Sequence, residues 1–427
     1  MGRLDAWIAL TLLALAAPAG AAELTRVPSA SPFELDLSVS WVRTQRSGSI
    51  SRESAAAAVA GQPFPAVGDL RQLRFAETTN TLVTRAAVGL WEDLGLTVEV
   101  PYLLGKETGW RLGSGVGAVA ELPDTIGTNA LYPDGTTCTT SCAIFPTAST
   151  VYHGASLGDL VVGLDWGVFS DRRDDTKPFW LVGVAVTFPT AKLYDPGADR
   201  TANWVLPTTY YTTSSKAAAG EKLLRYDLHT ALSRRIGKLD PYFRAHVTLL
   251  QKSSGTPSNC DHAADLVAAD QARPDMVALC QGGAEKWGAR LPWLAGLTFG
   301  VELVPYEDRA AGQKLAFDFR LSAERTSSAR WLNELSDATG KLMATEAFTT
   351  GTARVGLVFR ASDNVSVQAA ASCGYTAPHF LSGEDQGGTG TTVTNPNFDW
   401  RYDAPGRRFR SSESTTFDIV ATGVILF

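Results

Sequence analysis

Apolar and polar side chains alternate along many short segments of the chain, and this alternation is the main clue to its fold. Segment 314–325 is the sharpest case, since it reads KLAFDFRLSAER, with large apolar residues at every second position and mostly charged residues between them. A strand places alternate side chains on opposite faces, whereas a helix would scatter these charges around its axis. The pattern therefore predicts β-strands.

Twelve such segments run through the chain, and most reach the about nine to eleven residues with which a tilted strand crosses a bilayer. They are segments 33–43, 72–91, 94–104, 157–169, 178–189, 222–235, 240–251, 286–303, 313–325, 346–360, 364–376 and 411–427.

The connections between these segments alternate between short and long. The short ones are 92–93, 236–239 and 361–363, and the long ones are 44–71, 105–156, 190–221, 252–285, 326–345 and 377–410. This is the arrangement of an outer-membrane barrel, whose turns face the periplasm and whose loops face outward. We expect an all-β, antiparallel, up-and-down transmembrane barrel of about 12 strands, with 10 or 14 as alternatives.

The two ends of the chain support export and insertion. Arg3 precedes an apolar run at 6–17, and small residues after Pro18 offer a cleavage site, so residues 1–22 are expected to be a signal peptide and 23–427 a single barrel domain. The chain closes on Phe427, which resembles the terminal aromatic signal of the barrel-assembly machinery. We therefore expect a protein of the cell outer membrane, in contact with its lipid and lipopolysaccharide.

Composition and charge argue against other classes of protein. No later segment has the about 18 continuous apolar residues of a membrane helix, and a net charge of -6 argues against a nucleic-acid partner. A soluble β-sandwich would have to bury, on its inner face, the tryptophans that the alternation gathers on the apolar face. These are Trp41, Trp91, Trp166, Trp180, Trp287 and Trp293.

The opposite face of the strands should line a lumen. Twelve strands lie between barrels that side chains fill and barrels with a wide aqueous channel, so any pore should be narrow. Charges of both signs occur on this face in similar numbers, which fits either a selective constriction or a salt-bridge network that holds the wall rigid. The candidate lumenal residues are Asp227, His229, Arg244, His246, Asp318, Arg320 and Arg354.

Two of these candidates should face each other. If Arg235 lies opposite Asp240, then His229 lies opposite His246, within about 5.5 Å along the ladder. The imidazoles would then either share a metal ion or titrate near neutral pH, or they would simply be hydrogen-bonded lumenal side chains. We favour the last interpretation and expect no metal.

The sequence gives no support for catalysis. His229 and Ser233 share a strand face but are separated by roughly 13 Å, four strand residues, and neither a GxSxG nor an HExxH motif occurs. We expect no enzymatic activity and no cofactor.

The cysteines indicate an oxidising compartment. Cys138 and Cys142 fall in one predicted loop and Cys260 and Cys280 in another, so each pair is a disulfide candidate. Cys373 should face lipid as a small apolar residue.

Segments GASLGDLVVGLDWGVF and PFWLVGVAVTFPTAK, together with VGLWEDLGLTVEVPY at 88–102, resemble an outer-membrane barrel family assigned to the MetA pathway of phenol degradation. The chain departs from that family at Ala191, where Gly is usual. The resemblance implies passage of small, often hydrophobic, molecules. We expect a passive channel whose long loops fold over the mouth; the alternative is a structural or adhesive barrel whose loops bind surface partners.

Overall fold

The computed structural model describes residues 27, 32–55, 67–112, 148–170, 177–195, 214–215, 219–268, 272–281, 284–308, 310–390, 392–400 and 402–427. The expected signal peptide and the pair Cys138 and Cys142 lie outside these residues.

Twelve long strands close into an antiparallel barrel, as the alternation predicted. They are β1 (Leu35–Ala55), β2 (Val67–Trp91), β3 (Leu94–Leu112), β6 (Leu160–Phe169), β7 (Phe179–Phe188), β9 (Leu223–Ser233), β10 (Leu239–Lys252), β11 (Leu294–Asp308), β12 (Gln313–Thr326), β15 (Phe348–Ser362), β16 (Val365–Thr376) and β18 (Phe409–Leu426). Each pairs with the next one along the chain, and β1 pairs with β18, which closes the sheet. Closure satisfies the backbone groups that a bilayer cannot hydrate.

The remaining elements are short. Four strands extend the barrel sheet, β4 (Ala148–His153), β5 (Ser156–Leu157), β8 (Ser214–Ser215) and β17 (His379–Phe380), while β13 (Ala329–Trp331) and β14 (Met343–Thr345) form a sheet of their own. The helical turns are η2 (Asn259–His262), α4 (Ala263–Ala268), α5 (Met276–Gln281), η3 (Ala284–Trp287) and α6 (Ser336–Thr339). None of the described helices is long and apolar enough to cross a bilayer.

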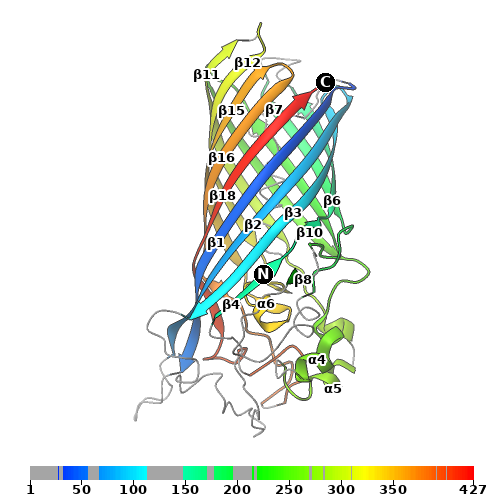
Figure 1. The fold of residues 1–427 in the computed structure, drawn as a ribbon, viewed down its shortest axis with the longest axis vertical. Coiled ribbons are helices and arrows are strands. Elements are labelled where there is room, and N and C mark those ends of the chain that lie inside the picture. Colours follow the sequence, from blue (N-terminus) through cyan, green and yellow to red (C-terminus); the bar gives the residue numbers. More distant parts are fainter. Residues whose placement is uncertain are drawn as a thin grey trace.

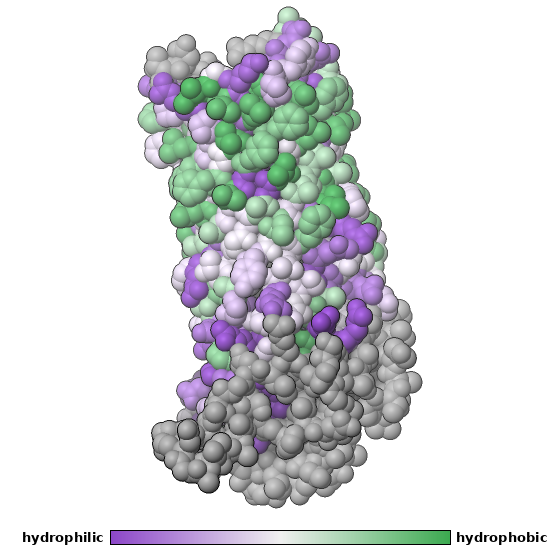
Figure 2. Space-filling model, turned by 90° about the vertical axis from the view of Figure 1, so that its left-hand side faces the viewer, coloured by the Kyte–Doolittle hydropathy of each residue, from purple (hydrophilic) through white to green (hydrophobic). Residues whose placement is uncertain are grey.

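The two ends of the barrel differ. The tight turns and the C-terminus lie at one end, at the top of Figure 1, and the helices lie at the other. Figure 2 shows a hydrophobic belt on the wall nearer the turn end and a more polar surface toward the loop end. The outward side chains of this belt include Leu37, Val39, Trp41, Leu164, Trp166, Leu297, Phe319, Leu321, Val355, Phe359, Phe417 and Ile419. The fold is therefore that of a transmembrane β-barrel of the outer-membrane type.

The predicted loop boundaries at 44–71 and 105–156 are wrong. β1 continues to Ala55 and β2 begins at Val67, so much of segment 44–71 is strand, and β3 continues to Leu112. The outward positions of β1 become polar from Arg43 onward, through Gln45 and Ser47. Beyond the bilayer the outward face of a strand meets water instead of lipid, so its residues can be polar. The alternation of apolar and polar residues therefore ends before the strand does.

The predicted tryptophans mostly lie on the outer wall. Trp91, Trp166 and Trp293 are strongly exposed, and Trp41 less so. Trp287 is different, because it belongs to η3 among the loops rather than to a barrel strand. Its assignment to the lipid-facing row was wrong, since the segment 286–303 becomes strand only at Leu294.

Candidate functional site: the polar lumen

The two lumenal histidines lie opposite each other, as predicted, because His229 on β9 pairs with His246 on β10. Their rings bind different carboxylates. Nε2 of His229 lies 2.8 Å from Oδ1 of Asp165, and Nε2 of His246 lies 3.1 Å from Oε2 of Glu324. Among the described residues, no group of three or more His, Cys, Asp or Glu side chains is placed to hold a metal ion. The two imidazoles thus contact different carboxylates, and Nδ1 of His229 also lies 3.4 Å from Oδ1 of Asp227.

Both imidazoles reach their carboxylates across a glycine on the intervening strand. Gly183 on β7 lies between His229 and Asp165 in the register, and Gly296 on β11 lies between His246 and Glu324. A Cβ at Gly183 would lie 2.3 Å from Nε2 of His229, and one at Gly296 would lie 2.2 Å from Cε1 of His246. Only glycine leaves room for a side chain to cross to a partner two strands away.

A third crossing involves Tyr242 on β10. Its hydroxyl donates to Oδ1 of Asp318 at 2.8 Å, and a Cβ at Gly300, on the strand between, would lie 2.2 Å from Cζ of the tyrosine ring. Asp318 also accepts from Arg320, whose Nε and Nη2 lie 2.9 and 2.5 Å from Oδ2. Glycine gaps thus connect three long side chains to acidic residues on the far strand.

Further carboxylates are held by hydroxyl groups. Asp227 on β9 accepts from Thr248 at 2.8 Å. Asp418 on β18 accepts from Thr44 at 2.7 Å and from Ser372 at 2.8 Å. The polar wall therefore consists of specific donor and acceptor pairs rather than of loosely placed charges.

Arg354 on β15 departs from this pattern. Its side chain is 3% exposed, and its three guanidinium nitrogens have no hydrogen-bond partner among the described residues. It lies directly opposite Arg320 on one side and Ser372 on the other. Like charges in direct cross-strand register repel each other.

All seven candidate residues lie on the inward face of their strands, where the alternation placed them. Arg244 is buried there on β10, in register with Ala231 and Thr298. Whether any of them selects a solute stays a prediction.

A loop enters the barrel from the loop end. Residues 327–347, which connect β12 to β15, carry the β13–β14 hairpin and α6, and most of their described side chains are buried. Leu335 and Met343 pack with Ile50 of β1, Phe75 of β2 and Trp110 of β3. The opposite flank of this inserted loop packs against the inward Leu223 of β9 and Leu294 of β11.

Polar contacts fix the tip of the inserted loop to the wall. Arg46 of β1 forms a buried ion pair with Glu334, and Nε1 of Trp110 donates to the Glu334 carbonyl at 3.0 Å. Nζ of Lys106, on β3, lies 3.9 Å from Oδ2 of Asp337. The inserted loop thus contacts both sides of the barrel and lies across its interior.

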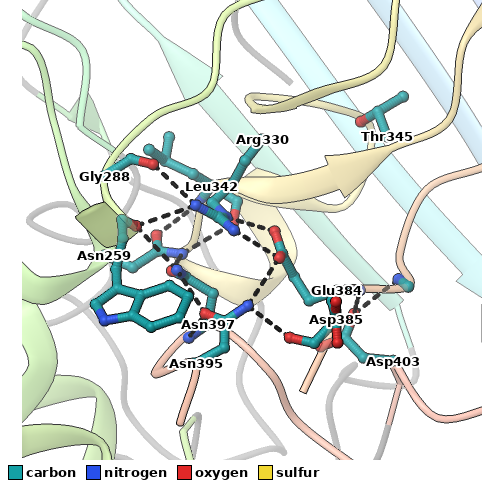
Figure 3. Close-up of polar contacts among 12 residues, drawn as sticks. Asn259, Gly288, Arg330, Leu342, Thr345, Glu384, Asp385, Asn395, Asn397 and Asp403 are labelled. Carbon is teal, nitrogen blue, oxygen red and sulfur yellow. Dashed lines mark hydrogen bonds and ion pairs between the residues drawn. The ribbon is translucent and has the colours of Figure 1, made fainter. Parts of the chain in front are cut away.

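A second polar network fixes the base of the inserted loop to the neighbouring loops (Figure 3). Arg330 forms a two-pronged ion pair with Glu384, which also accepts from Asn395 at 3.0 Å. Asn259 joins the backbone of Leu342, accepting from its amide at 2.7 Å and donating to its carbonyl at 2.9 Å. Three long connections, 253–293, 327–347 and 377–408, are therefore joined into one assembly.

The cysteine predictions are confirmed where the structure describes them. Cys260 and Cys280 form a disulfide, and Cys373 is a free, exposed residue on β16. The disulfide begins at the residue after Asn259.

The sequence interpretation missed the inserted loop, although a signal was present. Segment 329–345 reads ARWLNELSDATGKLMAT, which places Trp331, Leu332, Leu335, Leu342 and Met343 in what was treated as an exterior loop. Five large apolar residues so close together need burial. Their spacing has no helical or strand period, so the sequence does not indicate which surface they pack against.

Similarity to known proteins is confined to the fold. No protein-family model and no curated protein sequence matches the chain. An outer-membrane channel from Pseudomonas putida F1 is 12% identical over 93% of this chain and 97% of its own, with a TM-score of 0.40. A FadL homologue from Pseudomonas aeruginosa is 10% identical over 96% and 93%, with a TM-score of 0.35. The outer membrane protease OmpT from Escherichia coli is 6% identical over 94% and 99%, with a TM-score of 0.29. At these TM-scores none of the similarities bears on activity.

Proposed function

We propose that the protein is a narrow outer-membrane channel for small polar solutes, with the inserted loop as a removable constriction and no chemistry of its own. The lining favours polar solutes over the hydrophobic ones that the family resemblance implied, because charged side chains on several strands face the interior. A solute would exchange hydrogen bonds with water for hydrogen bonds with this wall.

The observation that carries the proposal is how the inserted loop is attached. Its flanking residues, Thr326 and Phe348, are register partners on adjacent strands. A turn of about two residues would be enough to join such strands. The chain instead places residues 327–347 there, folded inward. Their β13–β14 hairpin is not part of the barrel sheet, and they are held by side-chain contacts and by a few backbone hydrogen bonds, such as the one from the Glu346 amide to the Phe380 carbonyl. Such an element can move without opening the wall.

The first experiment is conductance in planar bilayers. A variant in which an Asn-Gly turn replaces residues 327–347 should conduct several-fold more than the wild-type mature chain, because the element that crosses the interior is gone. Glu334→Gln should open the channel more often, since it leaves Arg46 without its ionised partner.

Glu307→Gln is the matched control, because Glu307 pairs with Arg235 at 2.9 Å near the turn end, away from the inserted loop. Its conductance should equal that of the wild type. If neither the wild type nor the variant with the short turn conducts, or if removing the loop changes nothing, the channel proposal is wrong.

The second candidate function is a structural or adhesive barrel, and the order in the outer loops favours it. The Arg330–Glu384 pair, the asparagines around it and the Cys260–Cys280 disulfide would hold a fixed surface for a partner. The same conductance experiment separates the two candidates.

A further inference from the structure

One buried cation of the wall lacks the acceptor that its neighbours have. Arg354 offers five N–H donors, yet none of its three side-chain nitrogens has a partner among the described residues. The nearby carboxylates bind other donors, since Asp318 accepts from Arg320 and Tyr242. Asp418 in turn accepts from Thr44 and Ser372.

This arrangement is unfavourable for the empty wall. A buried guanidinium without hydrogen bonds is strongly destabilising, and the residue directly opposite, Arg320, is itself a cation and offers no acceptor. A neutral side chain at position 354 would serve a purely structural wall better. Buried polar groups without partners in a native structure are candidate ligand contacts.

We propose that Arg354, with Arg320 beside it, is a lumenal binding site for the carboxylate group of a small solute. The planar guanidinium matches a carboxylate in two parallel hydrogen bonds. A single negative charge fits better than two, because Arg320 is already neutralised by Asp318 and because Asp418 lies one residue further along the same register row. The site deepens the proposed function by naming the solute class, and rests on that function only for its role in transport.

Calorimetric titration of the mature chain in detergent with sodium acetate, at neutral pH and low chloride, tests the site. The wild type should bind acetate, and Arg354→Gln should bind it on the order of tenfold more weakly or not at all, because a charge-assisted pair is lost. Arg354→Lys keeps the positive charge but cannot form the two parallel hydrogen bonds of a guanidinium, so its affinity for acetate should lie between those of the wild type and Arg354→Gln.

Arg85→Gln is the control. Arg85 is also a lumenal arginine, but it already has an ion-pair partner, because its Nε lies 3.2 Å from Oε1 of Glu99. It should bind acetate like the wild type. A wild type that does not bind acetate, or an Arg354→Gln variant that binds it unchanged, overturns the assignment.

Stability in urea gives a second readout that does not depend on the ligand. Arg354→Gln should be at least as stable as the wild type, because it removes an unpaired buried charge, while Arg320→Gln should be less stable, because it leaves Asp318 without its guanidinium. Equal losses in both variants would show that Arg354 has a structural partner and would overturn the site.

The two proposals fail separately. Acetate binding by a protein that conducts no ions would refute the channel and leave the site. Conductance without acetate binding would refute the site and leave the channel.

Discussion

At the scale of single residues, the lumen depends on glycines as much as on charges. Gly183, Gly296 and Gly300 lie on the strands between each long side chain and its carboxylate. Strand interiors disfavour glycine, and close approach of another group is one reason that it is kept there. These glycines let partners two strands apart bind each other, and so stiffen the wall.

Gly183→Ala should destabilise the barrel by about 1–3 kcal/mol, the usual cost of adding a methyl group to a filled site. The new Cβ would lie 2.1 Å from Oδ1 of Asp165 and 2.3 Å from Nε2 of His229, so their hydrogen bond must break. Urea titration of the folded fraction measures the change. Gly423→Ala is the control, because nothing lies within 4 Å of its added Cβ. Equal stability of the two variants would refute the glycine-gap explanation.

At the scale of elements, long connections hold one another as well as the wall. The inserted loop is joined to the segment that carries η2 and α4 through Asn259. That segment in turn contacts the connection after β7, where Nε2 of His262 lies 2.8 Å from Oδ2 of Asp195. The position of the inserted loop should therefore depend on the contacts between these loops.

The His262–Asp195 contact should make the order of the loops depend on pH. The hydrogen bond to Asp195 raises the pKa of His262 above its ordinary value, so the folded state favours the imidazolium. The stabilisation is fully present below about pH 6.5, the unperturbed pKa, and is lost as the pH rises through the raised pKa. Hydrogen exchange of residues 259–268, corrected for its intrinsic pH dependence, should therefore speed up from pH 6 to pH 9.

His262→Gln and Asp195→Asn should both abolish this pH dependence, since each removes one charge of the pair. An unchanged pH dependence in either variant would assign the effect to another group.

At the scale of the whole molecule, the barrel closes where its first strand, β1, pairs with its last, β18. Phe427 donates its amide to the Leu35 carbonyl at 2.9 Å and accepts from the Leu35 amide at 3.2 Å. Its side chain is 68% exposed on the outer surface at the turn end. The last residue therefore pairs with the start of β1 and also presents an aromatic ring to the outside.

Deleting Phe427 should lower the amount of folded barrel in the outer membrane, because the closing strand loses two backbone bonds and its terminal aromatic residue. Heat-modifiable mobility in electrophoresis of membrane fractions measures this amount. The barrels that do assemble should have nearly wild-type conductance. Phe417→Ala is the control, since Phe417 is an outward aromatic residue within β18. An equal assembly defect in the control would remove any special role for the terminal residue.

Some of the site was predictable and some was not. The register that opposes His229 and His246 followed from the short turn at 236–239, because a tight turn fixes which residues pair. The carboxylates that bind these histidines lie on β6 and β12. Each is separated from its histidine by an intervening strand with a glycine at the crossing point, and no single turn fixes which residues meet across that strand. The same limit applies to Glu334 and Arg46, which are far apart in the sequence and meet only because a loop folds inward.

The sequence by itself determined a strand count of about 12, to within two strands, the inward and outward faces, the closing strand and the Cys260–Cys280 pair, because each depends on local period or spacing. Tertiary structure alone decided that β1 to β3 continue beyond the apolar belt, that residues 327–347 cross the interior, and that Arg354 is left without a partner. The physical reason is that alternation records only whether a side chain faces lipid or not. What it meets on the inward side depends on strands and loops that the closed barrel brings together from across the chain.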